Sequence, residues 1–222
     1  MWHEVRSGPL AAAVELLVER ERAKEQARVA AALEELAELA ARAAATLPEP
    51  IARAAELCAG ALRGGGKILV CGNGGSAADA AHFAAELVGR MRRERAPLPA
   101  ISLAVDPSVL TCVANDFGFE ELFARQVRAL GGPSDALVAI STSGRSPNVL
   151  AAIEAARSRG MATVALLGAG GDPRLEAADV QVRVPSRDTA RIQEIHTAAL
   201  HAICELLERD LLDRDGRERD PR

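Results

Sequence analysis

The chain has few aromatic residues and few histidines. Its 222 residues include one Trp, four Phe, no Tyr and four His. Proteins that stack nucleic-acid bases or sugar rings use aromatic side chains as platforms, so this composition argues against such a surface. With 31 acidic and 27 basic residues the formal net charge is −4. The chain therefore lacks the cationic excess that a nucleic-acid partner requires.

Cysteine pairs and long apolar runs are also missing. The four cysteines are widely separated and form no CxxC pair, so we expect reduced, buried thiols rather than zinc ligands or disulfides at positions 58, 71, 112 and 204. Acidic residues interrupt any signal-like pattern near the N-terminus. No run approaches the ~20 apolar residues of a membrane span. These features predict a cytoplasmic protein with no membrane partner.

The first part of the chain has the composition of long helices. Residues 10–46 are rich in Ala, Leu, Glu and Arg, and apolar residues recur there at three- and four-residue steps. A pair of prolines separates this helix from a second one at 51–63. We expect residues 1–63 to be N-terminal helices. About 1–25 form an extension, and the remainder packs on the domain and in an oligomer.

From residue 64 onward, short apolar runs alternate with helical segments. The runs that read as strands cover residues 67–71, 100–104, 136–140, 163–167 and 180–184. The predicted helices cover residues 76–91, 107–129, 147–159, 172–178 and 188–210. This alternation predicts an α/β domain with a parallel sheet buried on both faces. We place the domain at 64–210 and expect residues 211–222 to be a frayed, charged tail.

Two of the predicted strands run into loops suited to bind phosphate. The first strand leads into the glycine-rich segment 71–76 (CGNGGS), where backbone amides can approach a ligand at a helix N-terminus. The third leads into 141–146 (STSGRS), which places four hydroxyls before Pro147, a favoured first helical residue. Both loops follow the carboxyl ends of parallel strands, where ligands bind.

A dinucleotide site is the alternative for the first loop. Gly72, Gly74 and Ala77 fit the G-x-G-x-x-A pattern that follows a strand. The acid that could bind a ribose, Asp106, lies 34 residues after Gly72 instead of the usual ~20. No hydride-transfer constellation follows, and the Ser/Thr loop would be left without a role. We therefore predict no nucleotide cofactor.

Candidate functional side chains also lie on two helices, namely the helix that follows the first loop and the last predicted helix. They are carboxylates, amides and histidines. His82 and Glu86 are four residues apart, which places them on one helix face. In the last helix, Glu194 shares a stripe with His201, whereas Gln193 is rotated from His201 by about 80°. Spacing alone therefore favours Glu194 as the companion of His201. The other two histidines are expected to be incidental.

Four segments, taken in order, resemble the sugar isomerase (SIS) domain proteins and, among these, the phosphoheptose isomerases. They are CGNGGSAADAAHFAAELVGR (71–90), ANDFG (114–118), STSGRSPNVL (141–150) and RIQEIHTAALHAICEL (191–206). The resemblance covers about residues 30–209. It implies a three-layer, flavodoxin-like fold with a five-stranded parallel sheet, and a homotetramer with sites between subunits. It also implies isomerisation of sedoheptulose 7-phosphate to D-glycero-D-manno-heptose 7-phosphate through an enediol, the first step of nucleotide-activated heptose biosynthesis.

The resemblance also assigns residues to roles. It implies one zinc ion per subunit with the ligands His82, Glu86, Gln193 and His201, and so selects Gln193 over Glu194. Glutamine is an unusual zinc ligand. Glu86 and His201 become the acid/base pair, with Glu86 as the base that removes a proton. The implied substrate contacts are Asn73, Gly74, Gly75, Ser76, Asn115, Asp116, Ser141, Thr142, Ser143, Ser146 and Gln193.

Two alternatives stay open from the sequence. A non-catalytic SIS protein that binds the bacterial replication initiator resembles this chain at 185–194 (PSRDTARIQE) and 126–131 (QVRALG). That relative lacks equivalents of Glu86 and His201, and their presence here favours the enzyme. The chain could also isomerise another sugar phosphate. The motifs predict a phosphate-binding loop and an acid/base pair, but they do not determine how many carbons of the substrate lie between the two. The N-terminal extension has no family counterpart and leaves the subunit arrangement open.

Overall fold

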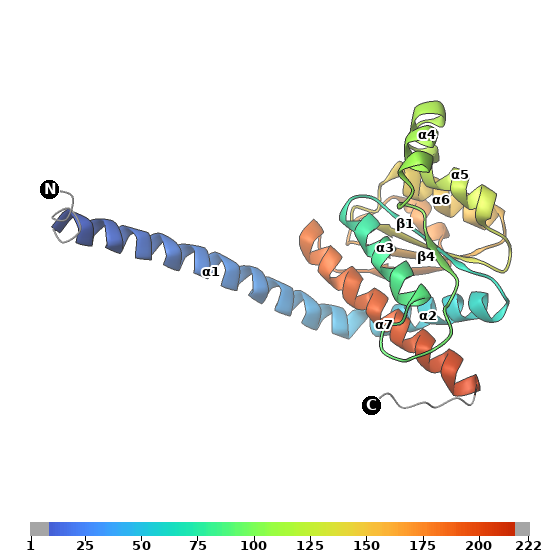
Figure 1. The fold of residues 1–222 in the computed structure, drawn as a ribbon, viewed down its shortest axis with the longest axis horizontal. Helices are drawn as coiled ribbons and strands as arrows, with labels where there is room; N and C mark the ends of the chain where they lie inside the picture. Colours follow the sequence, from blue (N-terminus) through green and yellow to red (C-terminus); the bar gives the residue numbers. More distant parts are fainter. Residues whose placement is uncertain (1–8, 216–222) are drawn as a thin grey trace. The chain divides into compact units, whose positions relative to one another are not determined.

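The computed structural model describes residues 9–215, and the chain divides into two compact units between Ala41 and Arg42. The first unit contains helix α1 (Pro9–Thr46) up to this division, so the helix predicted over 10–46 is present. The second unit contains the sheet and all the remaining elements (Figure 1). No helix in the described part of the chain has the length and apolar character needed to cross a bilayer.

The second unit alternates strands and helices as predicted. Its helices are α2 (Pro48–Arg63), α3 (Gly75–Val88), α4 (Pro107–Phe117), α5 (Glu121–Leu130), α6 (Pro147–Ser158), the 3₁₀ helix η2 (Pro173–Ala177) and α7 (Thr189–Asp215). Its strands are β1 (Ile68–Gly72), β2 (Ala100–Ser102), β3 (Ala136–Ser141), β4 (Ala162–Leu167) and β5 (Val180–Arg183).

The largest differences from the predicted elements concern two helices. The single helix expected over 107–129 is two helices, α4 and α5, because Gly118 at the end of α4 has a φ of +89° that a helix cannot accommodate. The last helix continues through Asp215, so residues 211–215 of the predicted tail are helical. Residues 216–222 lie outside the described part.

The sheet has five parallel strands in the order β2-β1-β3-β4-β5, as the fold prediction requires. This order reverses direction between β1 and β3. In open α/β sheets such a reversal opens a crevice at the carboxyl ends of the strands, because the following helices cover opposite faces. The loop after β1 and the loop after β3 therefore lie on the two sides of one crevice.

Helices cover both faces of the sheet and make it the middle of three layers (Figure 1). On one face, Leu69 of β1 and Leu137 of β3 join a buried cluster with Phe123 of α5 and Ile153 of α6. Strand residues that alternate with these point to the other face, which α2 and α3 cover, and α7 packs against both of these helices. All five residues of β1 and all six of β3 are buried, which accounts for their continuous apolar sequences.

The cysteine prediction was correct for three of four positions. Cys58, Cys71 and Cys204 are buried free thiols, and burial raises the pKa of each to about 12. Cys112, on α4, is exposed, because it lies on the face of the helix opposite to the core, whereas the next residue, Val113, is buried.

His196 is fully buried in α7 and is more than an incidental side chain. Its Nε2 donates to the carbonyl oxygen of Leu167 at 3.2 Å, which joins α7 to the carboxyl end of β4. Its Nδ1 is buried and has no hydrogen-bond partner among the described residues. Burial lowers the pKa of His196 to about 4, although the bond to Leu167 acts in the opposite direction.

His196 should make stability depend on pH. Because its folded-state pKa lies below the ordinary value of 6.5, the unfolded chain takes up the proton first as pH falls. Stability is then present above about pH 6.5 and is lost as pH falls toward 4. We expect the free energy of unfolding to fall by about 2 kcal/mol between pH 7 and pH 5. Urea denaturation of wild type and His196→Gln measures this, and an equal loss in the variant would contradict it.

Candidate functional site

An amide–amide pair joins the two loops at the crevice. The Nδ2 of Asn73, in the loop after β1, donates to Oδ1 of Asn148 at 2.8 Å, and the Nδ2 of Asn148 returns the bond at 2.8 Å. Asn148 lies in the first turn of α6 and is fully buried. The sequence patterns above did not indicate Asn148. The available signal was an asparagine just inside a helix that follows a polar loop, a position where a side-chain amide can bind backbone or a neighbouring loop.

The hydroxyls of the Ser/Thr loop make contacts within the loop itself. Ser141 and Ser146 lie with their Oγ atoms 3.1 Å apart, and Ser143 Oγ accepts from the backbone N–H of Arg145 at 3.2 Å. Gly144 has a φ of +61°, and a Cβ there would lie 2.7 Å from the Cα of Gly171. This turn therefore requires glycine.

Both helices that leave the crevice begin without a side-chain cap. Ser146 occupies the cap position of α6, but its hydroxyl faces Ser141 and makes no capping hydrogen bond. Gly74 occupies the cap position of α3 and has no side chain to offer. Helix N-termini carry partial positive charge and orphan N–H groups, so two uncapped ones at one crevice suit an anion such as phosphate.

The interface between α3 and α7 begins at the first loop. A Cβ at Gly75 would collide with the side-chain amide of Gln193, so glycine permits this close approach. One turn further along both helices, Thr197 Oγ1 donates to Asp79 Oδ1 at 2.9 Å. Burial raises the pKa of Asp79, although this hydrogen bond and nearby His82 lower it.

The next turn brings together two predicted functional histidines. The Nε2 atoms of His82 and His201 are 2.8 Å apart, with the ring planes inclined at 68°. One of the two nitrogens must carry a proton and the other must accept it. Glu86 Oε1 lies 3.7 Å from His82 Nε2. The His82 side chain is 45% exposed and that of Glu86 22%, so a ligand can reach both groups.

The structure places Gln193, and not Glu194, against the first loop. Glu194 Oε1 accepts from the guanidinium of Arg191 at 2.7 Å, in an i,i+3 ion pair on α7 itself. Spacing favoured Glu194 as the companion of His201, but Glu194 pairs with Arg191 on its own helix, whereas the amide of Gln193 lies against Gly75. The role of Gln193 as a ligand stays a prediction.

The donor types near His82 fit a zinc ion, although they do not form a complete ligand group. Among the described residues, no three His, Cys, Asp or Glu side chains are arranged to hold a metal. Two imidazole nitrogens and a carboxylate are nevertheless donors that zinc prefers. With Zn–N bonds of about 2.0–2.1 Å and tetrahedral angles, two histidine nitrogens lie about 3.3 Å apart. His82 and His201 would need to separate by only about 0.5 Å from their 2.8 Å contact.

Asn115 and Asp116 stand apart from the other predicted site residues. Both are exposed at the end of α4. Asn115 Nδ2 donates to Asp116 Oδ1 at 2.7 Å, and the Cys112 Sγ lies 3.6 Å from Asp116 Oδ2. Their hydrogen bonds within the described residues are local to α4, and none of these bonds reaches the loops at the crevice.

Comparisons with known proteins agree on one family. The SIS domain family profile matches residues 33–168. A phosphoheptose isomerase of Shewanella sediminis (strain HAW-EB3) is 54% identical over 179 residues, which cover 79% of this chain and 91% of that relative. The solved phosphoheptose isomerase of Neisseria gonorrhoeae is 46% identical with a TM-score of 0.78, and that of Francisella tularensis is 39% identical with a TM-score of 0.80. Each alignment covers 83% of this chain and 98% of the solved one.

The amide pair between the loops should contribute to stability. Asn148→Leu keeps the side-chain size but removes both hydrogen bonds, so we expect the free energy of unfolding to fall by about 1–3 kcal/mol. Asn115→Leu alters an exposed asparagine and should change it by no more than about 0.5 kcal/mol. Urea denaturation of both variants measures the difference. Equal changes in the free energy of unfolding would show that the amide pair does not stabilise the fold.

Proposed function

Because the chain belongs to the SIS domain family, and is an isomerase of the phosphoheptose isomerase type, we propose that its substrate is sedoheptulose 7-phosphate. The product is D-glycero-D-manno-heptose 7-phosphate, and the reaction is the first step of nucleotide-activated heptose biosynthesis. One observation carries the chemistry. His82 and His201, on two different helices, meet at 2.8 Å beside Glu86 and about two turns from a phosphate-type crevice.

Binding is assigned to the two loops. The phosphate lies at the uncapped start of α6, where hydroxyls and backbone N–H groups surround it. The glycine-rich loop and Gln193 hold the sugar chain on the side of α3. The proposed contacts within this chain are Asn73, Gly74, Gly75, Ser76, Ser141, Thr142, Ser143, Ser146 and Gln193.

Proton transfer is assigned to Glu86 and His201. The carboxylate of Glu86 removes a proton from C1 of the open-chain ketose, and His201 donates a proton to the oxygen on C2. The product of these two transfers is an enediol. The hydroxyl on C1 then gives up its proton as C2 receives one, which leaves an aldehyde at C1. No electron donor or acceptor is needed, because the reaction only moves hydrogen between neighbouring carbons and oxygens.

We extend the proposal to one zinc ion per subunit, held by His82, Glu86, Gln193 and His201. The donor types around the two histidines support it. When bound, the ion would polarise the carbonyl oxygen and stabilise the enediolate charge. Elemental analysis of purified wild type and His82→Ala tests the site without reference to activity, with zinc expected only in the wild type.

The proposed assembly is a cytoplasmic homotetramer with sites between subunits. Asn115 and Asp116 are exposed and their hydrogen bonds among the described residues stay within α4, which supports a site that a second copy completes. These two residues would then contact sugar bound mainly by the neighbouring chain. Size-exclusion chromatography with light scattering measures the number of chains.

The reaction is tested with purified protein and sedoheptulose 7-phosphate, with and without zinc, and with product detected by a heptose 7-phosphate kinase. We expect turnover of the seven-carbon ketose phosphate to exceed that of five- and six-carbon ketose phosphates. Preference for a shorter ketose would replace the proposed substrate. A folded protein with zinc present and no activity on any of them would reject the isomerase mechanism.

Glu86→Gln should separate proton transfer from binding. The substitution keeps the size of the side chain but removes the base, so kcat should fall by about 10²–10⁴-fold. The phosphate loop is untouched, so KM should change little. Glu154→Gln, which alters an exposed carboxylate on α6, is the matched control and should retain full activity. An unchanged kcat in Glu86→Gln would assign the base to another residue.

A further inference from the structure

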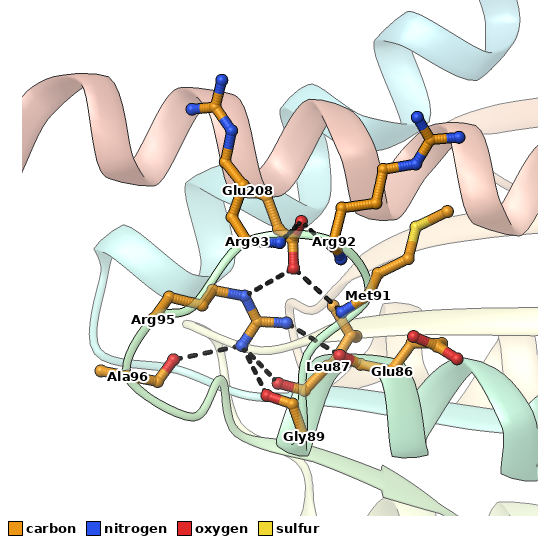
Figure 2. A network of polar contacts seen from close by, with 9 residues as sticks. All are labelled: Glu86, Leu87, Gly89, Met91, Arg92, Arg93, Arg95, Ala96 and Glu208. Carbon is orange, nitrogen blue, oxygen red and sulfur yellow. Dashed lines mark hydrogen bonds and ion pairs between the residues drawn. The ribbon is translucent and has the colours of Figure 1, made fainter. Parts of the chain in front are cut away.

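A buried carboxylate on α7 holds the loop that follows α3. Glu208 is 2% exposed, and its two carboxylate oxygens accept the backbone N–H groups of Met91, Arg92 and Arg93 at 3.0, 3.2 and 3.0 Å. Arg95 Nε donates to the same carboxylate at 3.2 Å (Figure 2). Four donors from one short loop therefore converge on a single side chain of another helix.

The Arg95 guanidinium in turn closes the end of α3. Its side chain is 3% exposed, and it donates to the carbonyl oxygens of Glu86 and Leu87 at 2.8 Å each, of Gly89 at 3.4 Å and of Ala96 at 3.1 Å (Figure 2). Carbonyls in the last turn of a helix have no partner within the helix. Arg95 supplies the missing donors, and one of the carbonyls it binds belongs to Glu86 itself.

The same pair reaches both sides of the proposed acid/base site. Glu208 lies seven residues, or two helical turns, after His201, on the same face of α7. Arg95 holds the backbone of Glu86 on α3. The chain Glu86–Arg95–Glu208 therefore links the helix that carries the base to the helix that carries the acid.

We propose that Arg95 and Glu208 are positioning residues that fix Glu86 relative to His201 for proton transfer. We call this pair the α3–α7 clamp, and its role rests on the proposed function. A buried ion pair contributes little net stability compared with apolar side chains of the same size. The planar guanidinium can instead bind several fixed acceptors at once, which lysine cannot do. The clamp thus holds the helical turn that contains Glu86 in one orientation.

A second buried carboxylate provides a matched control. Asp135 accepts the backbone N–H groups of Lys67 and Gly132 at 2.8 Å each and pairs with Lys67 Nζ at 2.7 Å. Burial alone would raise the pKa of Asp135, but these hydrogen bonds outweigh it and hold the pKa below its ordinary value. Asp135 immediately precedes β3 and so lies at the amino ends of the strands, whereas the crevice lies at their carboxyl ends. Its loss should affect stability without touching the site.

The experiment compares Glu208→Gln, Arg95→Met and Asp135→Asn by urea denaturation and by steady-state kinetics, at a temperature where circular dichroism shows each protein folded. All three should lose stability. Glu208→Gln and Arg95→Met should lower kcat by about 10–100-fold, because small misplacements of a catalytic group cost rates of this size. The KM for sugar phosphate should stay within about threefold. Asp135→Asn should keep wild-type kcat.

Each possible outcome either supports or overturns the proposed role of the clamp. A folded Glu208→Gln with full kcat overturns the clamp alone, and so does an equal loss of kcat in Asp135→Asn. A wild type that converts no sugar phosphate overturns the proposed function and, with it, the clamp's role in proton transfer. If Glu208→Gln does not fold, Arg95→Lys is the deciding variant. Lysine keeps the positive charge beside Glu208 but lacks the guanidinium that binds the carbonyl oxygens of α3. We expect this variant to be folded with a lowered kcat, and a fully active one would overturn the clamp.

Discussion

The contact between α3 and α7 is the constraint on which the candidate site depends. Each helix follows a parallel strand, so both begin at the crevice edge and run in the same direction. Their facing stripes meet in register over successive turns, through the pairs Gly75 and Gln193, Asp79 and Thr197, and His82 and His201. A shift of one residue along either helix would turn each of these side chains by about 100° and separate all three pairs.

The two ends of this interface are fixed by different means. At the crevice end, the absence of a side chain at Gly75 sets how closely the helices approach. At the far end, Glu208 and Arg95 set their relative position through hydrogen bonds to backbone groups. The histidine pair lies between these two ends, in a stretch that is partly open to solvent. The partly exposed histidine pair is therefore held between two close contacts of the same interface.

Most of the fold could be predicted from the sequence, because its signals are local. A buried parallel strand reads as an unbroken apolar run, and β1 and β3 do so clearly. The break between α4 and α5 was missed, since one glycine inside a helical pattern does not reveal its φ. Spacing on one helix likewise favoured Glu194, because only the partner helix shows that Gln193 faces the loop. Asn148 and Glu208 were missed for the same reason, since their partners are 75 and 113 or more residues away.

The bond between Asn73 and Asn148 joins the two sides of the crevice through neutral amides. Neither group changes its charge over the range in which a cell varies its acidity. The helix interface below it contains the ionisable side chains, two histidines and several carboxylates. The contact between the two loops is therefore insensitive to acidity, whereas the ionisable groups of this region lie on the facing stripes of α3 and α7.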